Sequence, residues 1–161
     1  MKIECIDRNT PFDVLSSFFN RIRVFLADLE NYYPFFTNWL NKVFTELKES
    51  DNRKILLCLD ENVNILGIAI LKNDTKEKKI CTLRVHKEYQ RKGIGTALLK
   101  RSIEELNDQY PLITVSERQI DDFSIFLSKN GFKLKDKVKS IYRKGEYEYF
   151  YNKEYKHTAV I

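Results

Sequence analysis

The sequence is poor in the residues that build metal sites and disulfide frameworks. Its 161 residues include three cysteines and two histidines. Cys5, Cys58 and Cys81 show no Cys-x-x-Cys spacing, so neither a zinc site nor a disulfide framework is expected. His86 and His157 lie too far apart in sequence to suggest a metal site. We therefore expect no metal, and we interpret the cysteines as small apolar residues of predicted strands in a reducing compartment.

Long apolar runs are also missing. No segment approaches the ~18 uninterrupted apolar residues of a membrane-spanning helix, and no signal peptide precedes Pro11. Apolar residues make up 43% of the chain and aromatic ones 13%, enough to fill one core, which excludes disorder. The length suits one domain and is short for two. We expect a cytoplasmic protein that binds no membrane, with a single domain over residues 1–152 and a flexible tail over 153–161.

Positive charge is concentrated near the C-terminus. The net charge of +5 falls within residues 129–156, since residues 1–128 carry equal numbers of basic and acidic side chains. A lysine-rich stretch of this kind is typical of a solvated strand edge, and we favour that interpretation. The alternative is a surface for an acidic partner, such as RNA or a phosphate-bearing ligand. The electrical balance of the first 128 residues argues against a plain nucleic-acid-binding module.

Hydrophobic periodicity predicts an alternation of strands and helices. The expected strands cover 2–7, 53–60, 64–72, 79–86, 112–116, 132–134 and 146–151, and the expected helices cover 11–29, 36–47, 93–108 and 120–130. The first helix has a start signal, with Thr10 as N-cap, Pro11 at the first helical position and Asp13 at the third. This order, β-α-α-β-β-β-α-β-α-β-β, describes an α/β protein.

The most informative segment joins the fourth predicted strand to the third predicted helix. Gly93 and Gly95 lack a Cβ, so this turn can adopt positive φ and a ligand can approach the main chain. The unpaired N–H groups and the positive dipole end of the helix favour an anion, above all a phosphate. Arg91 and Lys92 add two cationic side chains. The segment therefore predicts a phosphate-binding loop.

Two widespread phosphate-binding motifs do not match this loop. The P-loop pattern Gly-x-x-x-x-Gly-Lys-Ser/Thr is absent, and Leu98 stands where a dinucleotide fingerprint needs its third glycine. The loop instead resembles the signature of the acetyl-CoA-dependent N-acetyltransferases of the GNAT superfamily, V-x-P-x-Y-Q-x-x-G-I-G-x-x-L-L. The matching residues are Val85, Tyr89, Gln90, Gly93, Ile94, Gly95, Leu98 and Leu99. Lys87 replaces the proline of many members.

A second motif follows at the expected distance. Residues 124–132, Ser-Ile-Phe-Leu-Ser-Lys-Asn-Gly-Phe, resemble the family's x-x-F-Y-x-K-x-G-F near the end of its last long helix. Gly131 suits the position after a helix C-terminus, and Phe132 suits the start of the next strand. The resemblance implies a GNAT-like fold, in which helices flank a central, mostly antiparallel sheet with two splayed strands.

The resemblance also implies how acetyl-CoA binds as the acyl donor. In the family the thioester arm lies between the two splayed strands, which correspond here to 79–86 and 112–117. The main chain of Leu83 and Val85 would bind that arm, and N–H groups of 91–96 would bind the pyrophosphate. The residues expected to contact acetyl-CoA are Leu83, Arg84, Val85, Gln90, Arg91, Lys92, Gly93, Ile94, Gly95 and Thr96.

The implied reaction is acetyl transfer to a primary amine of a small molecule or protein, by direct attack in a ternary complex. A lysine-like ammonium with a pKa of ~10.4 is neutral in about one part in a thousand at cytosolic pH, so a base must take its proton and an acid must protonate the leaving thiolate. Leu127 stands where many members have a tyrosine acid, and Ile120 replaces a common asparagine. We predict Tyr142, Ser124 or a water as the acid and Glu117 as the base.

Several alternatives remain open at this point. Tyr147 is a second tyrosine of the closing strands, and His86 is a candidate proton relay. The missing tyrosine allows a non-catalytic acyl-CoA-binding or interaction module, and the basic segment allows an enzyme that acetylates RNA-borne amines. The resemblance implies that the acceptor lies against the two N-terminal helices and the C-terminal hairpin, in a pocket that Tyr32, Tyr33, Phe35, Phe36 and Trp39 could wall. The identity of the acceptor, a homodimer and the use of other acyl-CoAs stay open.

Overall fold

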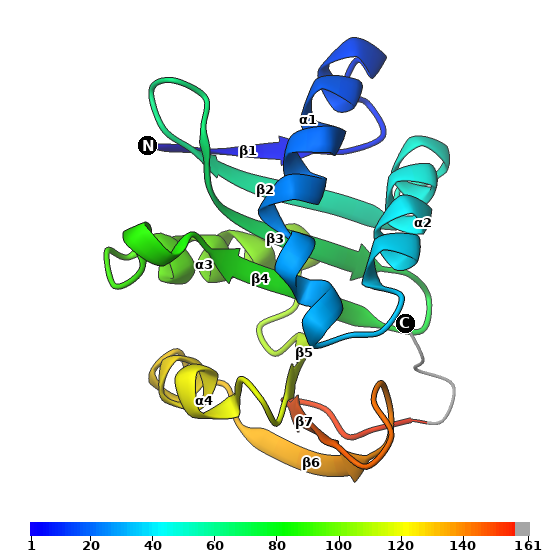
Figure 1. Ribbon diagram of the computed structural model, residues 1–161, viewed down its shortest axis with the longest axis vertical. Coiled ribbons are helices and arrows are strands. Elements are labelled where there is room, and N and C mark those ends of the chain that lie inside the picture. The colour runs from blue at the N-terminus through cyan, green and yellow to red at the C-terminus, as the bar shows by residue number, and fades with distance from the viewer. Residues whose placement is uncertain (157–161) are drawn as a thin grey trace.

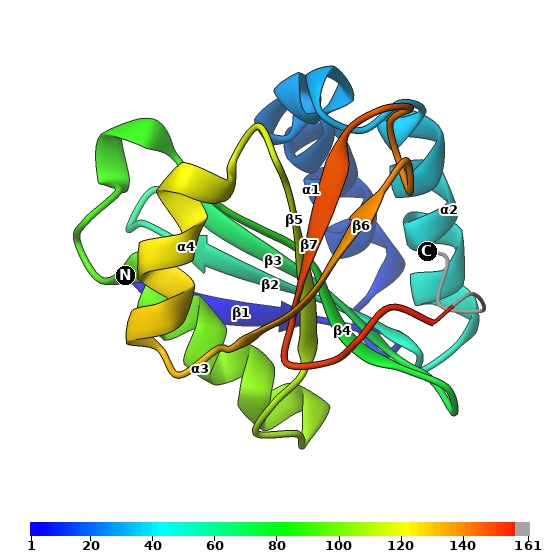
Figure 2. The ribbon, with the colours of Figure 1, turned by 90° about the horizontal axis from the view of Figure 1, so that it is seen from below.

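The computed structural model describes residues 1–156 as a seven-stranded sheet with two helices on each face (Figures 1 and 2). The elements are β1 (Lys2–Ile6), α1 (Phe12–Phe25), α2 (Phe36–Glu49), β2 (Arg53–Leu59), β3 (Ile65–Asn73), β4 (Lys78–Val85), α3 (Ile94–Leu106), β5 (Leu112–Ser116), α4 (Ile120–Lys129), β6 (Leu134–Lys139) and β7 (Tyr147–Tyr151). Short 3-10 helices cover Ala27–Asn31 and Lys87–Tyr89. The α/β class and the mostly antiparallel GNAT-like sheet are confirmed.

The centre of the sheet contains its one parallel pair among the described strands. The strand order is β1-β2-β3-β4-β5-β7-β6, and β4 and β5 are the parallel neighbours, connected through α3. In the described chain these two strands pair at two positions, Lys79 with Leu112 and Ile80 with Ile113, although both continue for several residues. Beyond these pairs the strands separate, as the family resemblance implies.

A β-bulge bends β4 where it leaves β5. Along β3, consecutive residues pair with Ile80 and Thr82, so Cys81 is an additional residue in the ladder. As a result Ile80 and Leu83, three positions apart, belong to the same apolar cluster. The bulge thus lies at the point where the central strands splay.

Each face of the sheet has its own apolar core. The cluster on one face includes Leu15 and Ile22 of α1 and Leu40 of α2, and the cluster on the other includes Leu98 of α3 and Leu127 of α4. These side chains are almost fully buried. Burial on both faces explains why the central strands have near-continuous apolar sequences.

The start and end of the first helix differ from the prediction. α1 ends at Phe25, and Leu29 lies in the following 3-10 helix. Thr10 does not cap α1, since its hydroxyl oxygen accepts a hydrogen bond from the Asp7 N–H at 3.1 Å. A local turn therefore uses the threonine hydroxyl that was expected to satisfy the helix.

The lysine-rich stretch forms the edge strand β6. The expected strand over 132–134 is wrong in its bounds, because the Phe132 N–H donates to the Leu127 carbonyl at the end of α4 and pairing in the sheet begins only at Leu134. Lys135 and Lys139 are exposed, and the Lys137 ammonium lies 4.3 Å from the centre of the Tyr147 ring on β7. This arrangement agrees with the strand-edge interpretation.

The first residues of the expected tail contact the body of the protein. Lys153 Nζ lies 2.7 Å from Asp108 Oδ2, and the Tyr155 and Phe150 rings pack at 5.4 Å. Residues 157–161 of that tail lie outside the described residues. Within residues 1–156, no helix has the length and apolar character needed to cross a membrane.

Candidate active site

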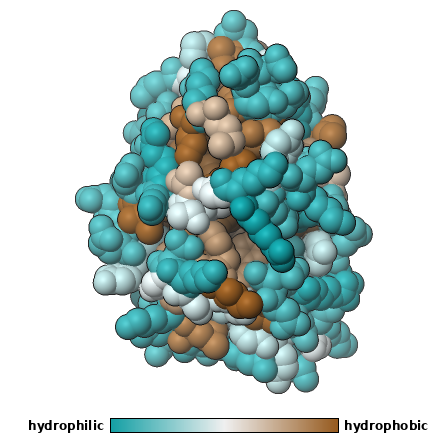
Figure 3. Space-filling view, turned by 90° about the vertical axis from the view of Figure 1, so that its left-hand side faces the viewer, coloured by the Kyte–Doolittle hydropathy of each residue, from teal (hydrophilic) through white to brown (hydrophobic). Residues whose placement is uncertain are grey.

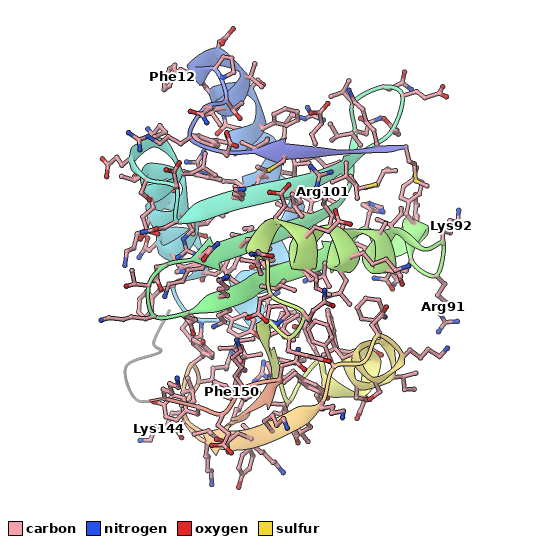
Figure 4. All side chains as sticks on the ribbon, turned by 180° about the vertical axis from the view of Figure 1, so that it is seen from behind. Phe12, Arg91, Lys92, Arg101, Lys144 and Phe150 are labelled. Carbon is pink, nitrogen blue, oxygen red and sulfur yellow. The ribbon has the colours of Figure 1, made fainter. Side chains whose placement is uncertain are left out.

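The loop between β4 and α3 forms a cradle of main-chain N–H groups. Arg91 and Gly93 have positive φ angles of 63° and 86°, a backbone conformation that makes an anion-binding concavity. In the described chain, the N–H groups of 91–96 have no main-chain acceptor outside the helix. The Arg91 and Lys92 side chains point outward from the start of α3 (Figure 4). The cradle therefore fits the pyrophosphate that the sequence predicted.

Two side-chain contacts fix this loop. Gln90 donates from Nε2 to the Val85 carbonyl oxygen at 3.2 Å, which links the loop back to the end of β4. A Cβ at Gly95 would lie 3.3 Å from the Phe126 ring, so any other residue here would require the ring to shift slightly. On this side of the molecule, apolar groups interrupt an otherwise hydrophilic surface (Figure 3).

A cavity occupies the space between the splayed strands and reaches both faces of the sheet. It contains about 850 Å³ free of protein atoms, partly open to solvent. Leu83, Val115 and Phe123 line it from the face that α3 and α4 cover. Leu29, Phe36 and Trp39 line it from the face that α1 and α2 cover. The other lining residues are Tyr33, Pro34, Lys79, Cys81, Thr82, Arg84, Ile113, Thr114, Gln119 and Tyr142.

A buried carboxyl group lies behind two of these lining residues, Tyr33 and Thr114. Glu148 on β7 is 3% exposed, and the Tyr33 hydroxyl donates to its Oε2 at 3.3 Å. Burial is the main cause that raises the pKa of Glu148 to about 7, against the opposing effects of the Thr114 hydroxyl, the Lys79 charge and Tyr33. Burial and the neighbouring Glu148 charge raise the pKa of Tyr33 well above its ordinary value. Tyr33 therefore stays protonated at neutral pH.

Two buried cations lie beside the bulge. Lys79 is 4% exposed, and its Nζ donates to the Tyr142 hydroxyl oxygen at 3.2 Å. Arg53 is 2% exposed; its Nε lies 2.8 Å from Glu46 Oε2, and its Nη1 lies 3.4 Å from Cys81 Sγ. Lys79 thus reaches the cavity, while Arg53 lies behind it with its own carboxylate.

The predicted catalytic residues lie in different places. Of the three, Tyr142 lines the cavity, whereas Glu117 and Ser124 are not among its described lining residues. Glu117 Oε1 accepts the Tyr147 N–H at 2.7 Å, and the Glu117 N–H donates to the Tyr147 carbonyl at 3.0 Å. Ser124 is half-buried on α4. Their catalytic roles stay predictions.

Sequence reasoning did not single out Lys79 or Glu148. Glu148 carried a usable signal, because it is an ionisable residue on the inward phase of an alternating strand. Tyr33 was expected as one of five aromatic residues that could wall the acceptor pocket, and Tyr33, Phe36 and Trp39 of that set do line the cavity. Lys79 was placed at the start of a predicted strand and given no role.

Comparisons with known proteins agree with this geometry. Residues 29–145 match the model of the acetyltransferase (GNAT) domain family. Because this match covers more than half of the chain, the protein belongs to the GNAT acetyltransferases. No curated protein matches it by sequence.

Solved structures share the fold at low sequence identity. A GNAT-family acetyltransferase from Staphylococcus aureus Mu50 is 19% identical, with a TM-score of 0.66 over 94% of this chain and 100% of that one. PaiA N-acetyltransferase from Thermoplasma acidophilum, in complex with coenzyme A, is 18% identical, with a TM-score of 0.61 over 93% and 98%. A proposed streptothricin acetyltransferase from Bacillus anthracis, in complex with acetyl coenzyme A, is 19% identical, with a TM-score of 0.58 over 66% of each chain. The family match makes this chain a GNAT acetyltransferase, and two of these structural neighbours were solved with coenzyme A or acetyl coenzyme A bound.

Proposed function

We propose that this enzyme transfers the acetyl group of acetyl-CoA to a primary amine of a small molecule or protein, by direct attack in a ternary complex. The observation that supports this most is the cavity that crosses the sheet between β4 and β5. The donor reaches it from the cradle at the start of α3, and the acceptor from the face of α1 and α2. Holding both substrates in one passage supplies the proximity that amine attack on a thioester needs.

The donor half uses main-chain groups. The N–H groups of 91–96 would bind the pyrophosphate, with Arg91 and Lys92 at the rim. Because pairing with β5 ends at Ile80, the edge of β4 around Leu83 and Val85 can bind the pantetheine arm. The thioester carbonyl would then lie near the bulge.

Glu148 is the group best suited to take the proton of the acceptor ammonium. It is screened from the cavity by Tyr33 and Thr114, whose hydroxyls both contact it. Tyr33 can therefore accept a proton from the amine while it passes its own to Glu148. A base with a pKa near the working pH is effective in this role. Glu117 remains the alternative base.

Tyr142 is the candidate acid for the leaving thiolate. Lys79 donates to its oxygen, which leaves the hydroxyl proton of Tyr142 directed elsewhere in the cavity. In the transfer step the neutral amine attacks the thioester carbonyl, a C–N bond forms and the C–S bond breaks. The Tyr142 proton passes to sulfur, and the second proton of the acceptor nitrogen passes to the Tyr142 oxygen, which leaves an amide, a thiol and a protonated Tyr142. Ser124 is the alternative, and replacing each of the two residues separately distinguishes them.

The test combines calorimetric titration with acetyl-CoA and detection of free thiol across amines, peptides and RNA. We expect micromolar binding and thiol release that depends on an added small amine or peptide. Binding without release on any acceptor would favour a non-catalytic module, and release confined to RNA would favour the RNA-directed alternative. Propionyl-CoA in the same assay measures donor selectivity.

A further inference from the structure

The charged residues that line the cavity are all cationic. Among the described lining residues, Lys79 and Arg84 carry charge, and no aspartate or glutamate does. Arg84 has a counterion, because its guanidinium pairs with Asp28 in the 3-10 helix after α1. Lys79 has no carboxylate within 4.0 Å in the described chain, and its hydrogen bond goes to the Tyr142 hydroxyl.

Lys79 is therefore a buried charge that forms no ion pair among the described residues, although the charges of Glu77 and Glu148 act on it from further away. An ammonium removed from water costs several kcal/mol unless an opposite charge compensates it. The nearby carboxyl groups have other partners: Glu77 lies 2.9 Å from Lys72 Nζ, and Glu148 accepts from Tyr33. Two of the three Lys79 protons are available. An anionic group in the cavity would complete this arrangement.

The apolar lining residues indicate which kind of acceptor the cavity can hold. Leu29, Phe36 and Trp39 form an apolar surface on the side of α1 and α2. A polycationic acceptor would place a second ammonium near Lys79 and Arg84. Among the described lining residues there is no carboxylate that could bind this second ammonium. Like charges at such short range repel strongly in a buried site. The cavity thus favours an apolar body with one amine and one anionic group.

We propose that the acceptor is an amino acid with an apolar or aromatic side chain, whose carboxylate pairs with Lys79 while its amine faces Tyr33. This assignment rests on the proposed function, since it concerns the acceptor half of the same cavity. The proposal names the class of acceptor that Lys79 and Arg84 would select.

Matched acceptors test the assignment through turnover. L-Phenylalanine, L-phenylalaninamide and phenethylamine share a ring and an amine and differ in the carboxylate. We expect kcat/KM for the amino acid to exceed that of the other two by at least about tenfold, as befits a buried charge pair. Lys79→Met and Lys79→Gln should abolish this preference, and Lys79→Gln keeps a donor for Tyr142. Lys144→Met, an exposed lysine outside the cavity lining, should keep the preference.

A binding experiment tests it without turnover. In calorimetry on the protein saturated with coenzyme A, 3-phenylpropionate should bind the wild type and Lys144→Met but not the two Lys79 variants. Retained acetyl-CoA affinity and an unchanged melting temperature show that those variants are folded.

The outcomes separate the two proposals. Equal turnover of all three amines, or a carboxylate preference that survives in both Lys79 variants, would overturn the amino-acid assignment and leave the acetyltransfer proposal intact. Binding of 3-phenylpropionate that depends on Lys79, with no amine acetylated, would support the anion site and overturn the proposed transfer to amines.

Discussion

The two halves of the cavity are built from different groups. The proposed donor half consists of main-chain groups from one continuous segment, 83–96. The acceptor half consists of side chains from four separate segments, namely Tyr33, Lys79, Tyr142 and Glu148. Main-chain donors survive most substitutions, whereas a side-chain cluster changes with each one. The donor half therefore carries what this chain shares with its family, and the acceptor half carries what it selects.

The largest effect is expected where a substitution fills the donor half. In Gly95→Glu the new Cβ meets the Phe126 ring, and a negative charge enters the anion cradle. We expect the affinity for acetyl-CoA to fall more than about 100-fold, a loss above about 2.7 kcal/mol, and all turnover to cease. Calorimetry measures this. Lys100→Glu, at an exposed position five residues further along α3, is the control. Equal acetyl-CoA affinity of Gly95→Glu and the wild type would show that the cradle is not part of the donor site.

Replacing the proposed base should affect the acceptor half alone. We expect Glu148→Gln to lower kcat by about 100-fold, since general base catalysis typically contributes this much. The affinity for acetyl-CoA should not change. In the wild type kcat/KM should rise with pH through about 7, where Glu148 ionises, and this limb should disappear in the variant. If instead Glu117→Gln removes the limb, Glu117 is the base.

Removing the proposed acid should have a smaller effect. Tyr142→Phe keeps the ring that packs on Tyr33 and removes the hydroxyl that Lys79 contacts. We expect kcat to fall at least about tenfold, because water can only partly replace Tyr142 as the acid. The loss should be smaller with an acyl donor whose leaving thiol is more acidic. Ser124→Ala is the control, and an equal loss in that variant would transfer the role to Ser124.

Stability should also depend on Glu148. Its pKa is raised from 4.5 to about 7 in the folded protein, so the folded state holds this proton more tightly than the unfolded chain. The stability that this group contributes is therefore complete below about pH 4.5 and is lost as the pH rises through about 7. Urea unfolding between pH 5 and 8 should show a decline in the wild type that Glu148→Gln lessens. Parallel curves for the two proteins would contradict the raised pKa.

The smallest effect is expected far from both halves. Replacing Lys133, Lys135 and Lys139 by glutamine removes exposed charges next to or on the edge strand β6. We expect unfolding free energies to change by less than about 0.5 kcal/mol per residue and kcat/KM for small amines to stay the same. Light scattering should reveal increased association, because charged edges oppose strand pairing between molecules. A selective loss of activity on RNA would instead favour an RNA partner.

The sequence predicted the donor half and the fold because both depend on local patterns. The glycines of the loop and the apolar periodicities are read within one segment. The described chain has seven strands and four helices in the expected order, although the sixth strand covers 134–139 rather than 132–134. The acceptor half could not be predicted in the same way. Glu148 and Tyr33 are 115 positions apart in sequence, and their contact, like the pairing of β7 with β5, depends on long-range packing. Thr10 was expected to cap α1, but its hydroxyl oxygen accepts a hydrogen bond from the Asp7 N–H instead.

The additional residue in β4 has a consequence for chain length. Ile80 and Thr82 face opposite sides of the sheet as adjacent strand residues would, so Cys81 acts as a spacer between them. Exchanging Cys81 for serine alters one atom and keeps the spacing. Deleting it would leave Leu83 and Arg84 on their present faces but give β4 an unbroken ladder with β3 and remove its bend. We therefore expect a one-residue deletion at this position to narrow the opening in the sheet, whereas the exchange of Cys81 for serine leaves the opening as it is.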